Sequence, residues 1–277
     1  MKRPVIIAIA AGFFVASTGL KAIISAPVKI DSGLVEGIAS GQPSVRVFKG
    51  IPFAAPPLGE NRWKAPQPVA KWEGVRKADA FGAPCTAGPA GGGRGGGRGA
   101  APGAAPGVAP GAAPGAAAPA APPAPPREPA RAEDCLYLNV WTSANSPNDR
   151  RPVMMWIYGG GFTGGSGGLA WYDGENLASK GAVIVTMNYR LGSLGFFSHP
   201  ELAKESGHNA SGNYGMMDAI AALQWVKRNI SAFGGDPNNV TVAGESAGAI
   251  MVGALSARRW PRGCFTARLQ RAAAGWV

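Results

Sequence analysis

The pattern of apolar and polar residues divides the chain into short strand-like runs and one longer helix-like run. Seven runs have strand length and are bounded by Gly, Pro, Asn, Asp or Ser. They cover residues 28–30, 33–37, 45–48, 136–142, 153–158, 182–188 and 240–243. The last three are almost wholly apolar, as in strands that are buried on both faces.

Between the last two of these runs lies a segment with helical periodicity. From Gly215 to about Ile230, apolar residues such as Leu223 and Val226 recur on one face. Buried strands that alternate with helices predict an α/β fold, with a mostly parallel central sheet and helices on both faces. Residues 50–57 contain three prolines, so we expect an irregular segment there.

Residues 86–132 interrupt this pattern with a Gly/Arg tract, Ala-Pro-Gly repeats and an Ala/Pro run. Such a segment cannot bury enough apolar surface to offset its ordering entropy, so we expect a disordered insertion. The net charge of +11 is confined to residues 1–26 (+3), 86–132 (+3) and 256–277 (+5), which leaves the remainder neutral. A neutral body gives a polyanion no attraction, and the Gly/Arg tract has no aromatic residue. We therefore expect no nucleic-acid partner.

The first 26 residues have the features of a secretory signal peptide. Lys2 and Arg3 precede an apolar run at 5–15, and Ala22 and Ala26 offer cleavage points. An uncleaved anchor is the alternative, although the run is short for a bilayer. We expect a secreted or periplasmic protein without stable membrane insertion after cleavage. In that compartment Cys85 and Cys135 can pair, with two free buried thiols as the alternative.

The segment 242–249 carries the most specific chemistry. It contains Gly-x-Ser-x-Gly, with Ser246 at its centre, directly after a strand and before an alanine-rich helix start. This context is typical of a nucleophile elbow, in which Gly244 and Gly248 allow close chain packing at a sharp turn. Ser246 is therefore the predicted nucleophile.

A glycine run at 159–161 follows the apolar strand at 153–158. Acyl transfer places negative charge on the former carbonyl oxygen, and preorganised backbone N–H groups stabilise that charge. A plain flexible loop is the alternative, but beside an elbow the run predicts an oxyanion hole. It lacks the Lys and hydroxyl of a phosphate loop, and no metal-ligand cluster occurs, so we expect no cofactor.

These motifs together resemble the type-B carboxylesterase family, which includes the cholinesterases. The order and approximate spacing of the motifs fit from about residue 27 to 255, apart from 86–132. The matching segments are 50–57 with Arg62 and Trp63, 133–140, 158–162, 188–192, 212–215 with Asp218, 233–237 and 244–248.

The resemblance implies a partial α/β-hydrolase domain over residues 27–255. It implies that Gly160, Gly161 and Ala247 donate the oxyanion-hole hydrogen bonds. It further implies a disulfide between Cys85 and Cys135 and buried ion pairs of Arg62 with Glu133 and of Arg190 with Asp218, for which solvated surface charge is the alternative. Glu245 is expected to be a supporting hydrogen-bonding group.

A serine nucleophile needs a base and an acid, which follow it in the chain in this fold. The 31 residues after Ser246 contain no Asp, Glu or His, while His199 and His208 precede it in a loop region. We therefore expect a domain truncated after the elbow helix, and an ester hydrolase that is nearly inactive as this chain. Its expected partner is a small-molecule ester.

Residues 256–277 form a basic tail without clear periodicity. Back-translation in another reading frame permits Leu-Phe-His-Arg-Ala-Ile-Ala-Lys-Ser-Gly-Gly-Trp, which looks like the esterase segment that follows the elbow helix. A frameshift is therefore one hypothesis for the tail. A non-catalytic binding or adhesion protein on the same fold is the alternative function, although such relatives typically lose the nucleophile.

Overall fold

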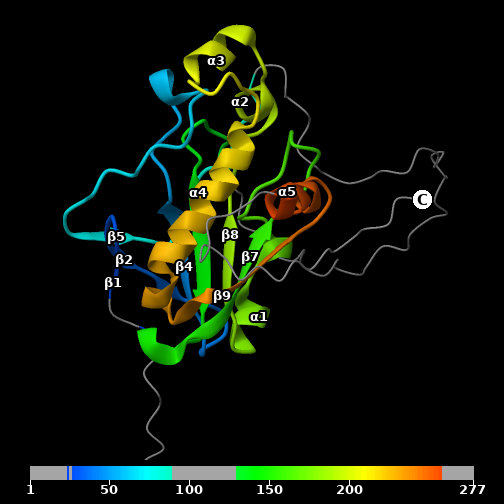
Figure 1. Cartoon of the computed structure of the whole chain (residues 1–277). Coiled ribbons are helices and arrows are strands. Elements are labelled where there is room, and N and C mark those ends of the chain that lie inside the picture. The colour runs from blue at the N-terminus through cyan, green and yellow to red at the C-terminus, as the bar shows by residue number, and fades with distance from the viewer. Residues whose placement is uncertain (1–23, 25–26, 89–128, 258–277) are drawn as a thin grey trace, which may run out of the picture.

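The computed structural model describes residues 24, 27–88 and 129–257. The expected signal peptide, most of the expected insertion and most of the basic tail lie outside the described residues. In the described part, six strands form the main sheet and three form a small second sheet (Figure 1).

The main sheet combines antiparallel and parallel pairing. Its strands follow the spatial order β3 (Ile38–Ala39), β4 (Arg46–Pro52), β6 (Tyr137–Thr142), β8 (Val183–Met187), β7 (Arg151–Ile157) and β9 (Gly235–Gly244). The first four are antiparallel neighbours, whereas β8, β7 and β9 run parallel. The parallel part therefore lies where the site motifs were predicted. The small sheet contains β1 (Val28–Ile30), β2 (Gly33–Glu36) and β5 (Val75–Lys77).

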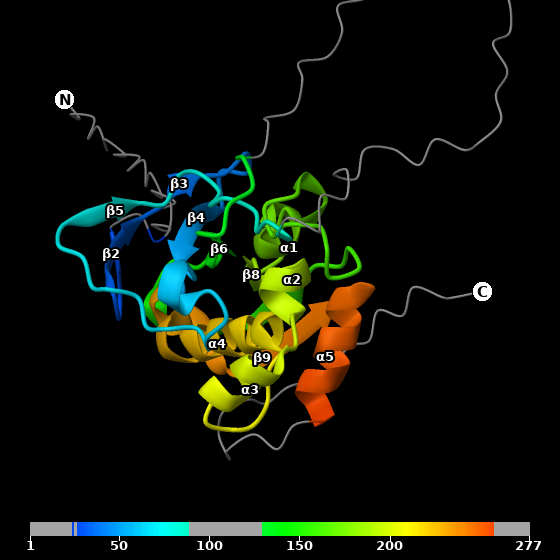
Figure 2. The same ribbon diagram turned by 90° about the horizontal axis from the view of Figure 1, so that it is seen from above.

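Helices cover both faces of the main sheet, as expected. Viewed from above, α4 (Tyr214–Asn229) and α5 (Ala247–Ala257) lie on one side and α1 (Glu175–Ser179) on the other (Figure 2). On the α4 and α5 side, Met155 and Ile157 of β7 join a core that contains Leu223. On the α1 side, Trp141 and Ile184 pack with Ala178 in a smaller core. Within β8, Val183 and Val185 belong to the first core and Ile184 to the second, as the alternation of side chains along a strand requires.

Several short helices lie in the loops that connect these strands and helices. The α-helices α2 (Gly192–Phe196) and α3 (Pro200–Glu205) follow β8. The 3-10 turns are η1 (Gly59–Asn61), η3 (Pro147–Asp149), η4 (Ala170–Tyr172) and η5 (Ile230–Phe233). Within the described ranges, no helix is both long and apolar enough to cross a membrane.

Most element predictions agree with the structure to within a few residues, and two differences have physical causes. The segment expected to be irregular from residue 50 still pairs with β6 through Pro52. A register shift between Phe48 and Ile51 absorbs the irregularity, and Pro52 stands at the strand end, where its missing N–H costs least. Strand β9 starts at Gly235, before the apolar run at 240–243, because Gly235 pairs with Arg151.

The disulfide between Cys85 and Cys135 is present, and both residues are buried. Next to it, Thr86 N–H donates to the Ala132 carbonyl at 3.0 Å and Ala132 N–H donates to the Pro84 carbonyl at 2.9 Å. The two ends of the segment 86–132 therefore leave the domain at one point. The insertion does not interrupt the sheet.

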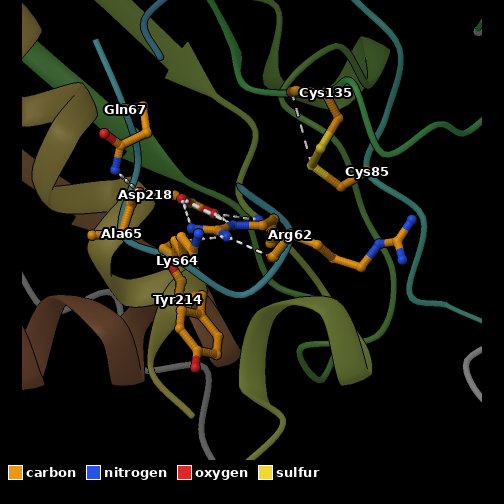
Figure 3. A network of polar contacts seen from close by, with 9 residues as sticks. Arg62, Lys64, Ala65, Gln67, Cys85, Cys135, Tyr214 and Asp218 are labelled. Carbon is orange, nitrogen blue, oxygen red and sulfur yellow. Dashed lines mark hydrogen bonds and ion pairs between the residues drawn. A yellow bond between two sulfur atoms is a disulfide. The ribbon is translucent and has the colours of Figure 1, made fainter. Parts of the chain in front are cut away.

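A buried ion pair ties the end of β8 to α4 (Figure 3). Arg190 donates to both carboxylate oxygens of Asp218, at 2.7–3.2 Å, and its other nitrogen reaches the carbonyls of Arg62 and Lys64. Burial raises the pKa of Asp218, while the Arg190 guanidinium opposes that rise. This pair confirms the expectation. The Arg62–Glu133 pair also forms, at 2.7 Å, but it is partly exposed because it lies on the surface of the domain.

Candidate active site

Ser246 lies at a strand-to-helix corner. Strand β9 ends at Gly244 and α5 begins at Ala247, and between them Ser246 adopts φ of +52°. Residues other than glycine rarely adopt this left-handed backbone conformation, which costs about 1–3 kcal/mol. Ser246 is exposed, whereas Gly244 and Ala247 on either side of the turn are buried. The hydroxyl-bearing residue thus stands at the surface of a tightly packed turn.

The two glycines of the motif make that packing possible. A Cβ on Gly248 would lie 2.1 Å from the carbonyl oxygen of Ile157, and one on Gly244 would lie 2.6 Å from the backbone of Gly248. Both distances are too short for any side chain. The Gly-x-Ser-x-Gly pattern therefore reflects backbone contact between the elbow and the end of β7.

The glycine run lies directly beside the elbow. Strands β7 and β9 pair in parallel up to Ile157 and Gly244. Beyond that point, a Cβ on Gly159 would lie 2.9 Å from the Ser246 Cβ, so Gly159 contacts Ser246. The carbonyl of Gly160 accepts hydrogen bonds from the amides of Thr163 and Gly164, both at 3.1 Å, which folds the run into a turn.

The predicted oxyanion-hole residues directly follow the two parts of the chain that meet at Ser246. Gly160 and Gly161 are exposed and come directly after Gly159, and Ala247 follows Ser246 at the start of α5. Among the described residues, their N–H groups have no protein acceptor. The start of α5 also carries the positive end of the helix dipole.

Two further contacts fix the glycine loop from the side of β8. The Phe162 ring meets Phe196 at 4.9 Å, and the Phe162 carbonyl accepts a hydrogen bond from Gly192 N–H at 2.7 Å. Below the loop, Tyr158 and Tyr189 stack at 4.5 Å, and each hydroxyl donates to the carbonyl of the other residue. The loop is therefore held in place before any ligand arrives.

Tyr172 is a residue of the site that the sequence did not reveal. Its hydroxyl donates to Glu245 Oε2 at 3.2 Å, and its ring lies 5.6 Å from that of Trp156. Burial raises the pKa of Tyr172 to about 12, as does the Glu245 carboxylate, and a backbone hydrogen bond from Gly159 opposes the rise. Glu245 therefore makes a supporting hydrogen bond, as expected. No local motif marks Tyr172, because its partner lies 73 positions away.

Within the described ranges, neither histidine forms a hydrogen bond with Ser246. His199 is the N-cap of α3, where its Nδ1 accepts a hydrogen bond from the Glu201 amide at 3.3 Å. His208 is exposed in the following loop, and its amide donates to Ser206 Oγ. These positions agree with the expectation that both belong to a loop region.

A pocket of about 230 Å³ opens on the α1 side of the sheet, below Tyr172. Its lining is largely apolar and consists of Met154, Trp156, Trp171, Tyr172, Asp173, Gly174, Leu177 and Ile184. Over the ranges that the structure covers, no group of three His, Cys, Asp or Glu residues could hold a metal ion.

Comparisons with known proteins place this geometry in a family. The model of the carboxylesterase family matches residues 25–273. Fumonisin B1 esterase of Sphingopyxis macrogoltabida is 46% identical over 224 residues, which cover 81% of this chain and 35% of that protein. Para-nitrobenzyl esterase of Bacillus subtilis (strain 168) is 40% identical over 234 residues, covering 84% of this chain and 40% of that protein.

Solved structures agree with the sequence comparison. A carboxylesterase of Geobacillus stearothermophilus superposes with a TM-score of 0.68 at 37% identity, over 88% of this chain and 43% of that one. The chain thus spans less than half the length of these relatives. The chain belongs to the carboxylesterase family and has the α/β-hydrolase fold.

Proposed function

We propose that this chain carries the nucleophile and the oxyanion hole of a serine carboxylic ester hydrolase. The observation that carries the proposal is Ser246 at φ of +52°, in contact with the glycine run. Its Oγ attacks the ester carbonyl carbon, and the amides of Gly160, Gly161 and Ala247 stabilise the oxyanion. The alcohol leaves with a proton, and water then hydrolyses the acyl-enzyme.

The substrate of this reaction is proposed only as a class. The relatives reported above are a fumonisin B1 esterase and a para-nitrobenzyl esterase, which differ in the substrate that they are named for but are both esterases. A small-molecule ester is the partner that fits an exposed serine beside free backbone amides. We propose no nucleic-acid partner, because the positive charge lies outside the neutral body.

Low turnover by this chain is part of the proposal. The nucleophile needs a base, and the 31 residues after Ser246 contain no Asp, Glu or His. General-base assistance contributes about 10²–10⁴-fold to such reactions. We therefore expect ester hydrolysis by the chain to be slower by about that factor than hydrolysis by an esterase with a base.

A secreted or periplasmic location is also proposed. The Cys85–Cys135 disulfide supports it, because such bonds persist in oxidising compartments. The predicted signal peptide at residues 1–26 supports it as well. Fractionation of the native host with an antibody to the domain tests the location, and a protein confined to the cytosol would contradict it.

The test of the mechanism is covalent labelling with an aryl fluorophosphonate, read by intact mass and peptide mapping. We expect one adduct, on the peptide with Ser246, which is lost in Ser246→Ala. Ser256→Ala is the matched control, because Ser256 is also an exposed serine but lies near the end of α5, away from the turn, and this variant should keep the adduct. Labelling that persists in Ser246→Ala, or no adduct on Ser246, would contradict the proposal and favour the non-catalytic alternative.

A further inference from the structure

We propose that Tyr172 is a positioning residue that sets the spacing between the glycine loop and the nucleophile elbow. The two parts of the oxyanion hole come from different strands, with Gly160 and Gly161 after β7 and Ala247 after β9. The hydrogen-bonded pairing of β7 with β9 holds the two strands together only as far as Ile157 and Gly244. Something beyond the ladder must hold the two loops together, because transition-state stabilisation depends on sub-ångström placement.

Backbone contacts hold them only in part. The Glu245 amide donates to the Ile157 carbonyl at 3.4 Å, which is long for a hydrogen bond. Gly159 touches Ser246 and the Glu245 carbonyl, but this contact limits approach and does not prevent separation. An attractive side-chain contact across the gap would resist that separation.

Tyr172 supplies that contact from a third element. It ends η4, which follows the glycine loop in the chain. Its ring lies against Trp156 of β7, and its hydroxyl donates to Glu245 of the elbow. One half-buried side chain thus connects the strand that leads into the glycine loop to the residue before the nucleophile.

The chemistry of the phenol suits this role. Burial raises the pKa of Tyr172 to about 12, so the phenol keeps its proton at neutral pH and serves as the hydrogen-bond donor to Glu245. Phenylalanine would preserve the ring contact and remove the hydrogen bond to Glu245, so Tyr172→Phe isolates the hydroxyl.

Tyr137 offers a matched control. Its hydroxyl donates to Asp134 at 2.9 Å, and burial raises its pKa to about 12 as well, but it lies at the start of β6. Tyr137→Phe therefore removes the same kind of hydrogen bond away from the elbow. Glu245→Gln is the conservative variant on the acceptor side, because its amide oxygen can still accept from Tyr172.

The first measurement is amide hydrogen exchange of peptides that cover 157–163 and 244–248. In Tyr172→Phe we expect the hydrogen-bonded amides in both peptides, such as those of Thr163 and Glu245, to exchange about fivefold faster, which corresponds to the loss of one ordinary hydrogen bond. Tyr137→Phe and Glu245→Gln should leave both peptides unchanged. Unchanged exchange in Tyr172→Phe, or faster exchange spread over the whole domain, would overturn the proposal.

The second measurement, which rests on the proposed function, is the kinetics of Ser246 phosphonylation. Tyr172→Phe should lower the maximal rate about tenfold with the half-saturating probe concentration unchanged, because misplacement affects the reacting geometry. An equal loss in Tyr137→Phe would overturn the role. If Ser246 of the wild-type chain does not react with the probe, the proposed function is wrong. The hydrogen-exchange result would still decide whether Tyr172 holds the glycine loop and the elbow together.

Discussion

At the residue scale, position 248 of the elbow has no room for a side chain larger than that of glycine. A Cβ there would meet the Ile157 carbonyl at 2.1 Å, and the contacting atom is backbone that cannot turn away. We expect Gly248→Ala to lower the free energy of unfolding by about 1–3 kcal/mol, as overpacking does elsewhere. Urea unfolding monitored by tryptophan fluorescence measures this change.

Gly253 in the same helix provides the opposite case. A Cβ at Gly253 would meet nothing within 4 Å, so Gly253→Ala should stabilise α5 by up to about 1 kcal/mol. Equal effects of the two substitutions would show that helix propensity, and not contact with β7, governs the glycine positions of the motif.

The Arg190–Asp218 pair is the second residue-scale feature with a clear consequence. Asp218→Asn would leave the guanidinium, which is 3% exposed, without its negative partner. Breaking a buried pair in this way costs about 3–5 kcal/mol, and we expect a loss of that size in urea unfolding. Glu201→Gln removes the partner of Lys204 in an exposed pair and should cost no more than about 1 kcal/mol. Similar losses in both variants would contradict the structural role.

At the element scale, the sequence predicted those strands, helices and turns that a local residue pattern determines. The strands at 28–30 and 183–187, helix α4 and the elbow all follow from apolar spacing and glycine placement. Strands β3 and β5 were not predicted, because they contain two and three exposed residues and form only through pairing with neighbours. Tyr172 was missed for the same reason, since its role depends on tertiary contacts.

The anchored ends of the segment 86–132 predict that its interior is dispensable for the domain. The disulfide and the bonds between Thr86, Ala132 and Pro84 close its base. Replacing residues 89–128 with a short Gly/Ser linker should therefore change the free energy of unfolding by less than about 1 kcal/mol, because loop-closure entropy varies slowly with length.

The base of the segment should matter far more than its interior. Cys85→Ser combined with Cys135→Ser should cost about 2–4 kcal/mol, because it releases a cross-link with a sequence separation of 50. If the linker variant lost as much stability as the double cysteine variant, the insertion itself would contribute to the packed domain. Both variants are compared by urea unfolding under oxidising conditions.

At the scale of the whole molecule, the main sheet has an open edge and exposed apolar side chains on its α1 side. In the described part of the chain, β9 is an edge strand of the sheet. On the α1 side, Trp171 is 83% exposed and Leu177 is 48% exposed at the pocket, and the buried indole N–H of Trp156 has no acceptor among the described residues. An open edge and exposed apolar side chains both favour association between chains.

We therefore expect the purified chain to associate reversibly with rising concentration through this side of the sheet. Trp171→Gln combined with Leu177→Gln should shift the weight-average mass in sedimentation equilibrium toward the monomer, because it removes the apolar rim without touching Ser246. Leu58→Gln is the control, because Leu58 is as exposed as Leu177, at 47%, but lies in the loop before η1. A loss of association in Leu58→Gln alone, or none in the double variant, would place the contact elsewhere on the molecule.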